Sequence, residues 1–370
     1  MFQKITRSDW ISKNSVDAVM AKKEAREGSR MQIERQVQQY RQWGTAAIPF
    51  IVMYAFGFLF STDLTYFWKG MLMLFSYLIY EVFEEYVFME DLLTVDPIYV
   101  YLATKFWMYV VWFVYIMSSV PLWDTIVFVA WSLVLWYNFL RAWKGDPGVI
   151  TVSEDERCEI MMNSLEQGGL DSALFCTTCM IRKPFRSKHC SVCNRCVARF
   201  DHHCLWLSNC VGWRNHKFFV GYLFSLVLMC IIFLLGAVKF MRKNLHKEWD
   251  FIHVVSFEPW ITFMSLQAAF YGIWVLGLMI CQLYTILWLG LTTNERLNRT
   301  RYAKRFGFAN MNLSTNSNPG VVKNFIDFFE LESFNPGKTD WMRVFPQDQE
   351  ESSVDSQPFI RDKWDSFQYV

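Results

Sequence analysis

The sequence carries almost no net charge, since 36 Lys and Arg residues balance 35 Asp and Glu residues to leave +1 over 370 residues. A balance this even gives no electrostatic reason to expect nucleic-acid binding, and we predict none. Residues 1–44 lack the apolar run of a signal peptide, so no cleavable signal is expected. What the chain has in excess is hydrophobic residues, 53% of the total, including many aromatics. That composition is typical of a protein embedded in lipid.

Six stretches are apolar enough to be expected to cross a membrane, which takes about 20 residues per helix. They cover about residues 45–60, 67–87, 103–120, 123–141, 217–238 and 266–290. Ser118-Ser119-Val120-Pro121 separates the third stretch from the fourth and predicts a tight hairpin. The predicted fold is therefore an all-α polytopic membrane protein with six transmembrane helices. Four of these helices precede a central polar segment and two follow it.

Positive charge predicts the orientation of these spans. Lys and Arg gather in residues 1–44, in residues 142–216 and in the segment that begins at Arg296, which six spans place on one side. Positively charged loops stay in the cytosol, so both termini and the central segment are expected there. Four cations are exceptions, because they fall in the predicted lumenal connection: Lys239, Arg242, Lys243 and Lys247. A transporter is disfavoured, since polar side chains deep in the spans are scarce.

The central segment holds seven of the ten cysteines, between Cys176 and Cys210. Cysteines separated by two residues, together with histidines, are typical of structural zinc sites in a reducing compartment. Mixed Cys and His ligands also favour zinc over an iron–sulfur cluster. Two tetrahedral sites of three cysteines and one histidine fit the pattern. The first predicted site is Cys176, Cys179, His189 and Cys196, and the second is Cys190, Cys193, His203 and Cys210.

Three residues of this segment remain without a structural role: Asp201, His202 and Cys204. A cysteine is nucleophilic as the thiolate, and a neighbouring imidazole can take its proton. A carboxylate behind that imidazole fixes its tautomer and stabilises the imidazolium that forms. We therefore predict Cys204 as nucleophile, His202 as general base and Asp201 as the group that orients the base. The alternative is a purely structural zinc module in which Cys204 is a spare thiol.

At these residues the sequence resembles the DHHC protein S-acyltransferases, which palmitoylate proteins at membranes. Asp201-His202-His203-Cys204 is similar to the signature of that family, and Asn209-Cys210-Val211-Gly212 continues its pattern. Asp146-Pro147-Gly148 resembles the family's DPG motif, and Thr292-Thr293-Asn294-Glu295 resembles its TTxE motif. Gly320 and Asn324 resemble part of a C-terminal element. Together these motifs cover roughly residues 45 to 345, far more than a chance motif match would.

The resemblance implies a two-step reaction with palmitoyl-CoA or a similar acyl-CoA as donor. Cys204 would accept the acyl group and pass it to a membrane-proximal cysteine of a protein substrate, while two zinc ions stay structural. Lys183, Arg186 and Lys188 would contact the CoA phosphates. Anionic lipid headgroups are an equally weighted alternative for these cations. A zinc-stabilised membrane scaffold with an inactive site is the alternative function, against which the intact Asp201, His202 and Cys204 argue.

Four spans before the zinc segment resemble the huntingtin-interacting and Akr-like subfamily, whose members carry ankyrin repeats. No 33-residue repeat occurs here, and residues 1–44 are too short for a stable ankyrin array. The resemblance also implies an endomembrane location, most often the Golgi. The expected organisation is a helical lead-in (1–44), four spans (45–141), a cytosolic zinc domain (142–216), two spans with a lumenal loop (217–291), a cytosolic TTxE and amphipathic-helix region (292–345) and a disordered tail (346–370).

Two short segments near the end of the chain carry local predictions. Thr292 and Glu295 have the spacing of a helix capping box, and the family resemblance implies that this motif packs on the catalytic segment. Residues 321–331 place Val322, Phe325, Ile326 and Phe329 at helical spacing, which predicts an amphipathic helix at the membrane surface. Asn324 is then expected to be a buried residue that hydrogen-bonds this helix to the rest of the protein.

Overall fold

The computed structural model describes residues 44–65, 67–75, 96–166, 175–184, 186–245, 257–299 and 320–329. Within these residues, five helices are long and apolar enough to cross a membrane, which confirms the predicted polytopic fold class. They are Gly44–Ser61, Pro97–Ser119, Leu122–Lys144, His216–Asn244 and Pro259–Trp288. Of the second predicted span only residues 67–75 are described, and these are helical. Residues 1–43 and the predicted tail, 346–370, lie outside the described residues.

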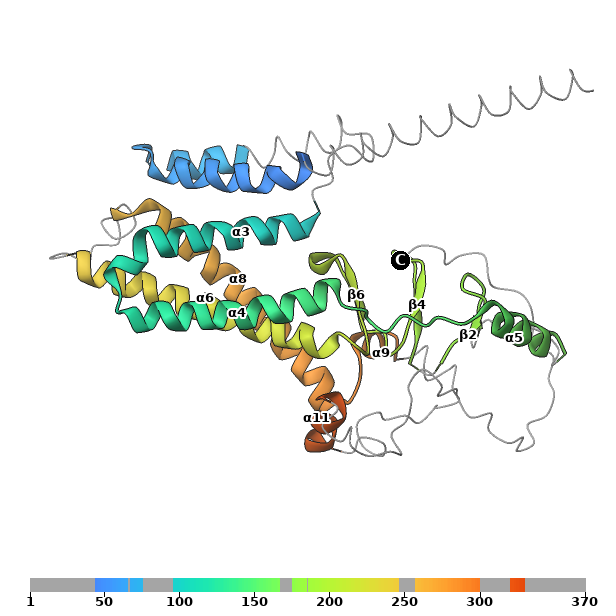
Figure 1. Cartoon of the computed structure of the whole chain (residues 1–370). Helices are drawn as coiled ribbons and strands as arrows, with labels where there is room; N and C mark the ends of the chain where they lie inside the picture. The colour runs from blue at the N-terminus through green and yellow to red at the C-terminus, as the bar shows by residue number, and fades with distance from the viewer. Residues whose placement is uncertain are drawn as a thin grey trace, which may run out of the picture.

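Helix α6 (His216–Asn244) is the centre of the bundle and packs against both α4 (Leu122–Lys144) and α8 (Pro259–Leu283). Helix α3 (Pro97–Val111) continues through η1 (Trp112–Ile116) and η2 (Met117–Ser119), and α4 begins three residues later. The tight hairpin predicted at residues 118–121 is therefore present. Figure 1 shows the bundle at one end of the molecule and the cysteine-rich segment at the other, joined by the ends of α4, α6 and α8.

The interior of the bundle is closely packed around one aromatic pair. Trp112 is fully buried and stacks on Phe128, with ring centroids 4.0 Å apart and planes inclined by 2°. Gly236 of α6 lies against the Trp112 ring, where an added Cβ would come within 2.5 Å of a ring carbon. The outward-facing side chains are also apolar and are largely exposed, as for Leu133 at 67% and Ile273 at 74%. An apolar outer surface on a packed bundle is what a lipid environment requires.

Two of the cations that depart from the charge rule, Lys239 and Lys243, have partners at the far end of the bundle. Lys239 Nζ lies 2.8 Å from both carboxylate oxygens of Asp124, in the first turn of α4. Lys243 Nζ donates to the backbone oxygen of Ser118 at 3.2 Å. These contacts join the end of α6 to the α3–α4 hairpin. Their structural role explains why cations occur at this end, against the general bias.

The cysteine-rich segment consists of three antiparallel two-stranded hairpins, which the sequence analysis did not assign. Their strands are β1 (Phe175–Cys176) with β2 (Ile181–Arg182), β3 (Lys188–Cys190) with β4 (Arg195–Val197), and β5 (His202–Cys204) with β6 (Asn209–Val211). The turn of the third hairpin contains a single 3-10 turn, η3 (Leu205–Leu207), which contacts α3. Helix α5 (Glu154–Glu166) precedes the hairpins.

Two short helices follow the bundle. In α9 (Thr293–Leu297) the predicted capping box is present, because Thr292 Oγ1 accepts from the Glu295 amide and Glu295 accepts from the Thr292 amide. In α11 (Val321–Phe329), Asn324 is buried and donates to the backbone oxygen of Leu287 at 2.8 Å, as predicted. Phe328 is the buried aromatic of this helix, whereas Val322 and Phe325 of the predicted apolar set are exposed.

Two buried asparagines attach the third hairpin to the bundle. Asn209 Nδ2 donates to the backbone oxygens of Ala142, Trp143 and Gly145 at 2.9–3.2 Å. Asn215 Nδ2 donates to Ala142 at 3.1 Å and to Cys210 at 2.8 Å. The last carbonyl groups of a helix have no partner within it, so these amides satisfy the end of α4. The same bonds fix the hairpin that carries Cys204 against the membrane-spanning helices.

We expect Asn209→Ala to destabilise the folded protein by about 1–3 kcal/mol, because it leaves buried carbonyl oxygens of α4 unpaired. Thermal unfolding of the detergent-solubilised protein, followed by tryptophan fluorescence, measures the effect. Asn298→Ala is the matched control, since the Asn298 amide donates only to Asn294 in the same short helix. Equal unfolding midpoints for the two variants would contradict the anchoring role of Asn209.

Candidate active site and metal centres

Each metal cluster is shared by two consecutive hairpins. Strand register places His189 opposite Cys196 in β3–β4 and His203 opposite Cys210 in β5–β6. His189 and Cys196 meet the Cys-x2-Cys turn of the first hairpin. In the same way, His203 and Cys210 meet the Cys-x2-Cys turn of the second hairpin. The resulting groups are Cys176, Cys179, His189 and Cys196, and Cys190, Cys193, His203 and Cys210. The structure thus brings the eight side chains together in the same two groups as the sequence partition.

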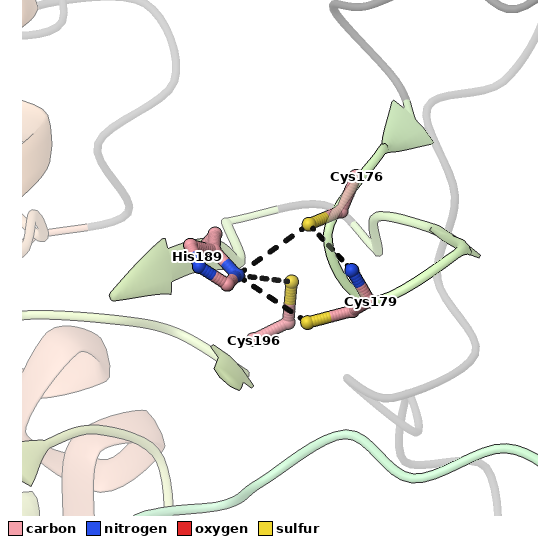
Figure 2. Close-up of side chains that lie close together, drawn as sticks. All are labelled: Cys176, Cys179, His189 and Cys196. Atoms are coloured by element: carbon pink, nitrogen blue, oxygen red, sulfur yellow. Dashed lines mark hydrogen bonds between the residues drawn. The ribbon is translucent and has the colours of Figure 1, made fainter. Parts of the chain in front are cut away.

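The geometry of both clusters fits a tetrahedral metal ion. In the first cluster, shown in Figure 2, His189 Nδ1 lies 3.3–3.9 Å from the three sulfur atoms. In the second, the corresponding distances from His203 Nδ1 are 3.3–3.7 Å. Ligands bound to one zinc ion at about 2.0–2.3 Å are separated by about 3.5–3.8 Å along the edges of the tetrahedron. Either cluster can therefore hold such an ion without rearrangement.

The three hairpins repeat every 14 residues, a period visible in the sequence. His189-Cys190-x2-Cys193-x2-Cys196 recurs as His203-Cys204-x2-Leu207-x2-Cys210. Met180, Asn194 and Ser208 occupy the same place in successive turns, and each has a positive φ, between 43° and 53°. The backbone of the third hairpin is therefore that of a metal-binding turn. Leu207 replaces the second cysteine of that turn, so Cys204 is left as a thiol with no metal partner.

Leu207 and Cys204 belong to the hydrophobic cluster of the bundle instead. Leu207 is fully buried, and only 9% of Cys204 is exposed. The aromatic ring of Phe219, in the first turn of α6, lies 5.2 Å from the imidazole of His202. The turn that would hold a third metal is thus inserted against the membrane-spanning helices. An acyl group on Cys204 would have apolar surroundings on that side.

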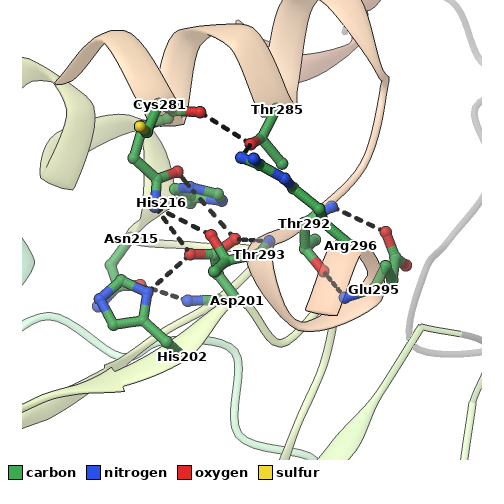
Figure 3. A network of polar contacts seen from close by, with 12 residues as sticks. Asp201, His202, Asn215, His216, Cys281, Thr285, Thr292, Thr293, Glu295 and Arg296 are labelled. Atoms are coloured by element: carbon green, nitrogen blue, oxygen red, sulfur yellow. Dashed lines mark hydrogen bonds and ion pairs between the residues drawn. The ribbon is translucent and has the colours of Figure 1, made fainter. Parts of the chain in front are cut away.

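Asp201 is the centre of the polar network drawn in Figure 3. Its carboxylate accepts from His202 Nδ1 at 2.7 Å and from the Thr293 amide at 2.6 Å. Its backbone oxygen accepts from the Asn294 amide at 3.1 Å, so the TTxE segment packs on the catalytic segment, as the resemblance implied. Only 1% of Asp201 is exposed. Since His202 donates through Nδ1, its Nε2 is the nitrogen available to the thiol of Cys204.

The electrostatics of this group suit an acid–base pair. Burial alone would lower the pKa of His202, but hydrogen bonds with Asp201 and Cys204 outweigh burial and raise that pKa to about 9. Burial would raise the pKa of Asp201, yet the nearby His216 and His202 and the Thr293 amide hold it well below its usual range. Asp201 therefore stays ionised beside an imidazole that readily holds a proton.

Gln282, in α8, is a site residue that the sequence analysis missed. Its Nε2 lies 3.2 Å from Asp201 Oδ2 and 3.1 Å from Thr293 Oγ1, and its Oε1 lies 3.3 Å from His216 Nε2. Because the carboxamide has two donors and one acceptor for these three partners, His216 donates from Nε2. His216 Nε2 is also 3.9 Å from Asp201 Oδ1. Two membrane-spanning helices, α6 and α8, thus help to hold the carboxylate.

Two of the three cations predicted to bind CoA also have partners within the chain. Arg186 forms a two-pronged ion pair with Glu295, at 2.5 and 2.6 Å, and also donates to the backbone oxygen of Gly290. Lys188 Nζ donates to Asn294 Oδ1 at 3.1 Å. Both contacts tie the second hairpin to the TTxE segment. Lys183 lies between the first and second hairpins, directly after β2, and it is half-buried.

Comparison with known families decides the identity of this domain. Residues 170–300 match the sequence model of the DHHC palmitoyltransferase family. The segment belongs to that family. The match contains both metal clusters, Asp201, His202 and Cys204, and the TTxE segment, so the DHHC domain includes every part of the polar network on Asp201.

Full-length comparisons extend the similarity beyond the DHHC domain. The chain is 38% identical to the palmitoyltransferase ZDHHC17 of Danio rerio over 88% of its own length and 54% of the relative's. It is 36% identical to the palmitoyltransferase Hip14 of Drosophila melanogaster over 97% and 58% of the two lengths. The human palmitoyltransferase ZDHHC13 is 31% identical over 89% and 55%. The chain thus spans little more than half the length of these relatives.

We expect Cys193→Ser to lower bound metal from about two ions per chain to about one, because it removes a ligand of the second cluster. Plasma mass spectrometry of the purified protein measures this stoichiometry. Cys158→Ser is the matched control, since Cys158 is exposed on α5 and lies outside both clusters. Unchanged metal content in Cys193→Ser would contradict the assignment of that cluster.

Proposed function

We propose that the chain is a protein S-acyltransferase that carries a long-chain acyl group on Cys204, from acyl-CoA to cysteines of protein substrates. The observation that carries this proposal is the third hairpin. It has the backbone of a metal-binding turn, but its cysteine belongs to neither metal cluster and lies against His202, which is hydrogen-bonded to Asp201. The relatives are named palmitoyltransferases, which supports palmitoyl-CoA as the donor.

In the first step His202 takes the proton of the Cys204 thiol, and the thiolate attacks the carbonyl carbon of the acyl-CoA thioester. The bond between that carbon and the CoA sulfur breaks, and CoA leaves as a thiolate that takes the proton from His202. In the second step His202 takes the proton of an acceptor cysteine, whose sulfur attacks the new thioester. Cys204 leaves and is reprotonated. Asp201 keeps its charge throughout and holds the imidazole in place.

The two clusters would hold zinc, since three thiolates and one imidazole in a tetrahedron are a typical structural zinc site. Cys176, Cys179, His189 and Cys196 would bind one ion, and Cys190, Cys193, His203 and Cys210 the other. A bound zinc ion supplies binding free energy that replaces a hydrophobic core. Because all four positions of each cluster are protein ligands, the zinc ions have a structural role.

Lys183, Arg186 and Lys188 remain the proposed contacts of the CoA phosphates. The ion pair with Glu295 gives the Arg186 guanidinium a fixed position beside the TTxE segment. We also propose that the zinc domain and the segments at both ends face the cytosol of an endomembrane, with the Golgi as the expected organelle. Reduced thiolates in the clusters agree with a cytosolic location.

Acyl-thioester formation on the purified protein tests the function. We expect incubation with palmitoyl-CoA to add one palmitoyl group, seen by intact mass and removed by hydroxylamine, and we expect Cys204→Ser to remain unmodified. Cys281→Ser is the matched control, because Cys281 is an exposed thiol of α8. No adduct on a folded wild type with two metal ions per chain would favour the scaffold alternative. An adduct on Cys204→Ser would assign the acyl group to another cysteine.

Gln282→Leu should slow the acylation of Cys204 about tenfold and leave the KM for palmitoyl-CoA unchanged, because it removes a hydrogen bond that orients Asp201. Single-turnover acylation at varied palmitoyl-CoA concentrations separates the two quantities. Gln267→Leu is the matched control in the same helix, where the amide donates only to the sulfur of Met53. A rise in KM alone, or an equal loss in both variants, would show that Gln282 does not act through Asp201.

A further inference from the structure

A polar pocket of about 720 Å³ lies beside the hairpin that carries Cys204. Its walls come from five parts of the chain: the start of α3, the end of α4 with the loop after it, the start of β4, the β5–β6 hairpin, and Arg214 in the connection between β6 and α6. Asn209, which lines the pocket, is the cross-strand partner of Cys204. The predicted CoA contacts Lys183, Arg186 and Lys188 are not among its lining residues.

The carboxylates of the pocket are already engaged. Asp96 accepts two contacts from Ser208 Oγ, at 2.7 and 2.8 Å, and caps α3 through the amide of Ile98. Asp146 accepts from the amides of Gly148 and Val149 at 2.9 Å and forms an ion pair with Arg214 at 2.6 Å. These bonds shape the walls, and the ion pair with Arg214 offsets the charge of Asp146, whereas Asp96 has neutral donors as partners.

Two cations of the same pocket have no carboxylate partner among the described residues. Lys144 is exposed, and its Nζ lies 3.9 Å from the centre of the neighbouring Trp143 ring. Arg195 is exposed at the start of β4. The lining holds three cations (Lys144, Arg195 and Arg214) and two carboxylates (Asp96 and Asp146), so its formal charge is 3 − 2 = +1. An anionic group is the ligand that this charge favours.

The position of the pocket relates it to the second step of the reaction. It opens where α3 begins and α4 ends, which is the membrane boundary on the side of the zinc domain. A membrane-proximal cysteine of a protein substrate approaches the acylated Cys204 from that boundary. The chain on either side of such a cysteine needs a surface next to the β5–β6 hairpin.

We propose that this pocket receives the acceptor segment of a protein substrate, with an acidic side chain beside its cysteine held by Lys144 and Arg195. The inference rests on the proposed acyltransferase function and names the substrate class for its second step. The acceptor thiol attacks the carbonyl carbon of S-acyl-Cys204, and the bond from that carbon to the Cys204 sulfur breaks. The proton of the acceptor passes through His202 to Cys204, so the transfer needs no further reactant.

Charge reversal tests the proposal, with Lys144→Glu and Arg195→Glu made separately. Two peptides serve as acceptors that differ only in whether glutamates or lysines flank their single cysteine. We expect each variant to lower kcat/KM for the glutamate peptide by about fivefold, the factor of an ion pair near a protein surface, and to raise it for the lysine peptide. Arg157→Glu is the matched control, since it makes the same charge change on α5, at a residue that does not line the pocket.

Self-acylation of Cys204 and metal content are measured on every variant, which separates this inference from the function itself. Normal self-acylation with a reversed peptide preference supports the proposal. A higher KM for palmitoyl-CoA in self-acylation would assign the cations to the CoA phosphates and overturn it. The same peptide preference in wild type and variants would overturn it too. Arg195 lies between two metal ligands, so Lys144→Glu decides the outcome if Arg195→Glu loses metal.

Discussion

The sharing of each metal cluster between two consecutive hairpins is the constraint on which the rest of the site depends. The segment has short strands and little core of its own, so metal ions bound at the two clusters would supply the free energy that a core otherwise provides. Because each cluster joins the turn of one hairpin to the strands of the next, three hairpins make two clusters. The turn of the last hairpin is left over. In that turn Leu207 is inserted into the bundle, and Cys204 is positioned beside His202.

A second set of contacts converts this placement into a reactive site. Asn209 and Asn215 bind the open end of α4, which fixes the hairpin on the membrane-spanning helices. Gln282 and the Thr293 amide hold the carboxylate of Asp201 from the other direction. The Arg186–Glu295 ion pair closes the connection between the TTxE segment and the hairpins. As the proposed nucleophile, Cys204 would then be oriented by helix ends, buried hydrogen bonds and the metal clusters before any substrate arrives.

Much of this arrangement could be predicted from local sequence. Apolar length predicts five helices that the structure describes, cysteine spacing predicts the two groups of four ligands, and Thr292 with Glu295 predicts a capping box. Contacts between distant residues could not be predicted, because local pattern carries no information on them: Gln282 lies 81 residues from Asp201, and Glu295 lies 109 residues from Arg186. Helical spacing in α11 identified apolar residues but not the buried ones. The aromatic that packs on His216 is Phe328, while Phe325 is exposed.

The most direct test of the central claim is the alkylation rate of each cysteine in the folded, metal-loaded protein, mapped by peptide mass spectrometry after brief exposure to iodoacetamide. Of the seven cysteines between Cys176 and Cys210, only Cys204 should react quickly. The other six should become reactive only after a chelator removes the metals, since metal-bound thiolates are protected. Protection of Cys204, or equally fast reaction of a cysteine assigned to a cluster, would contradict the assignment of the third turn as the free one.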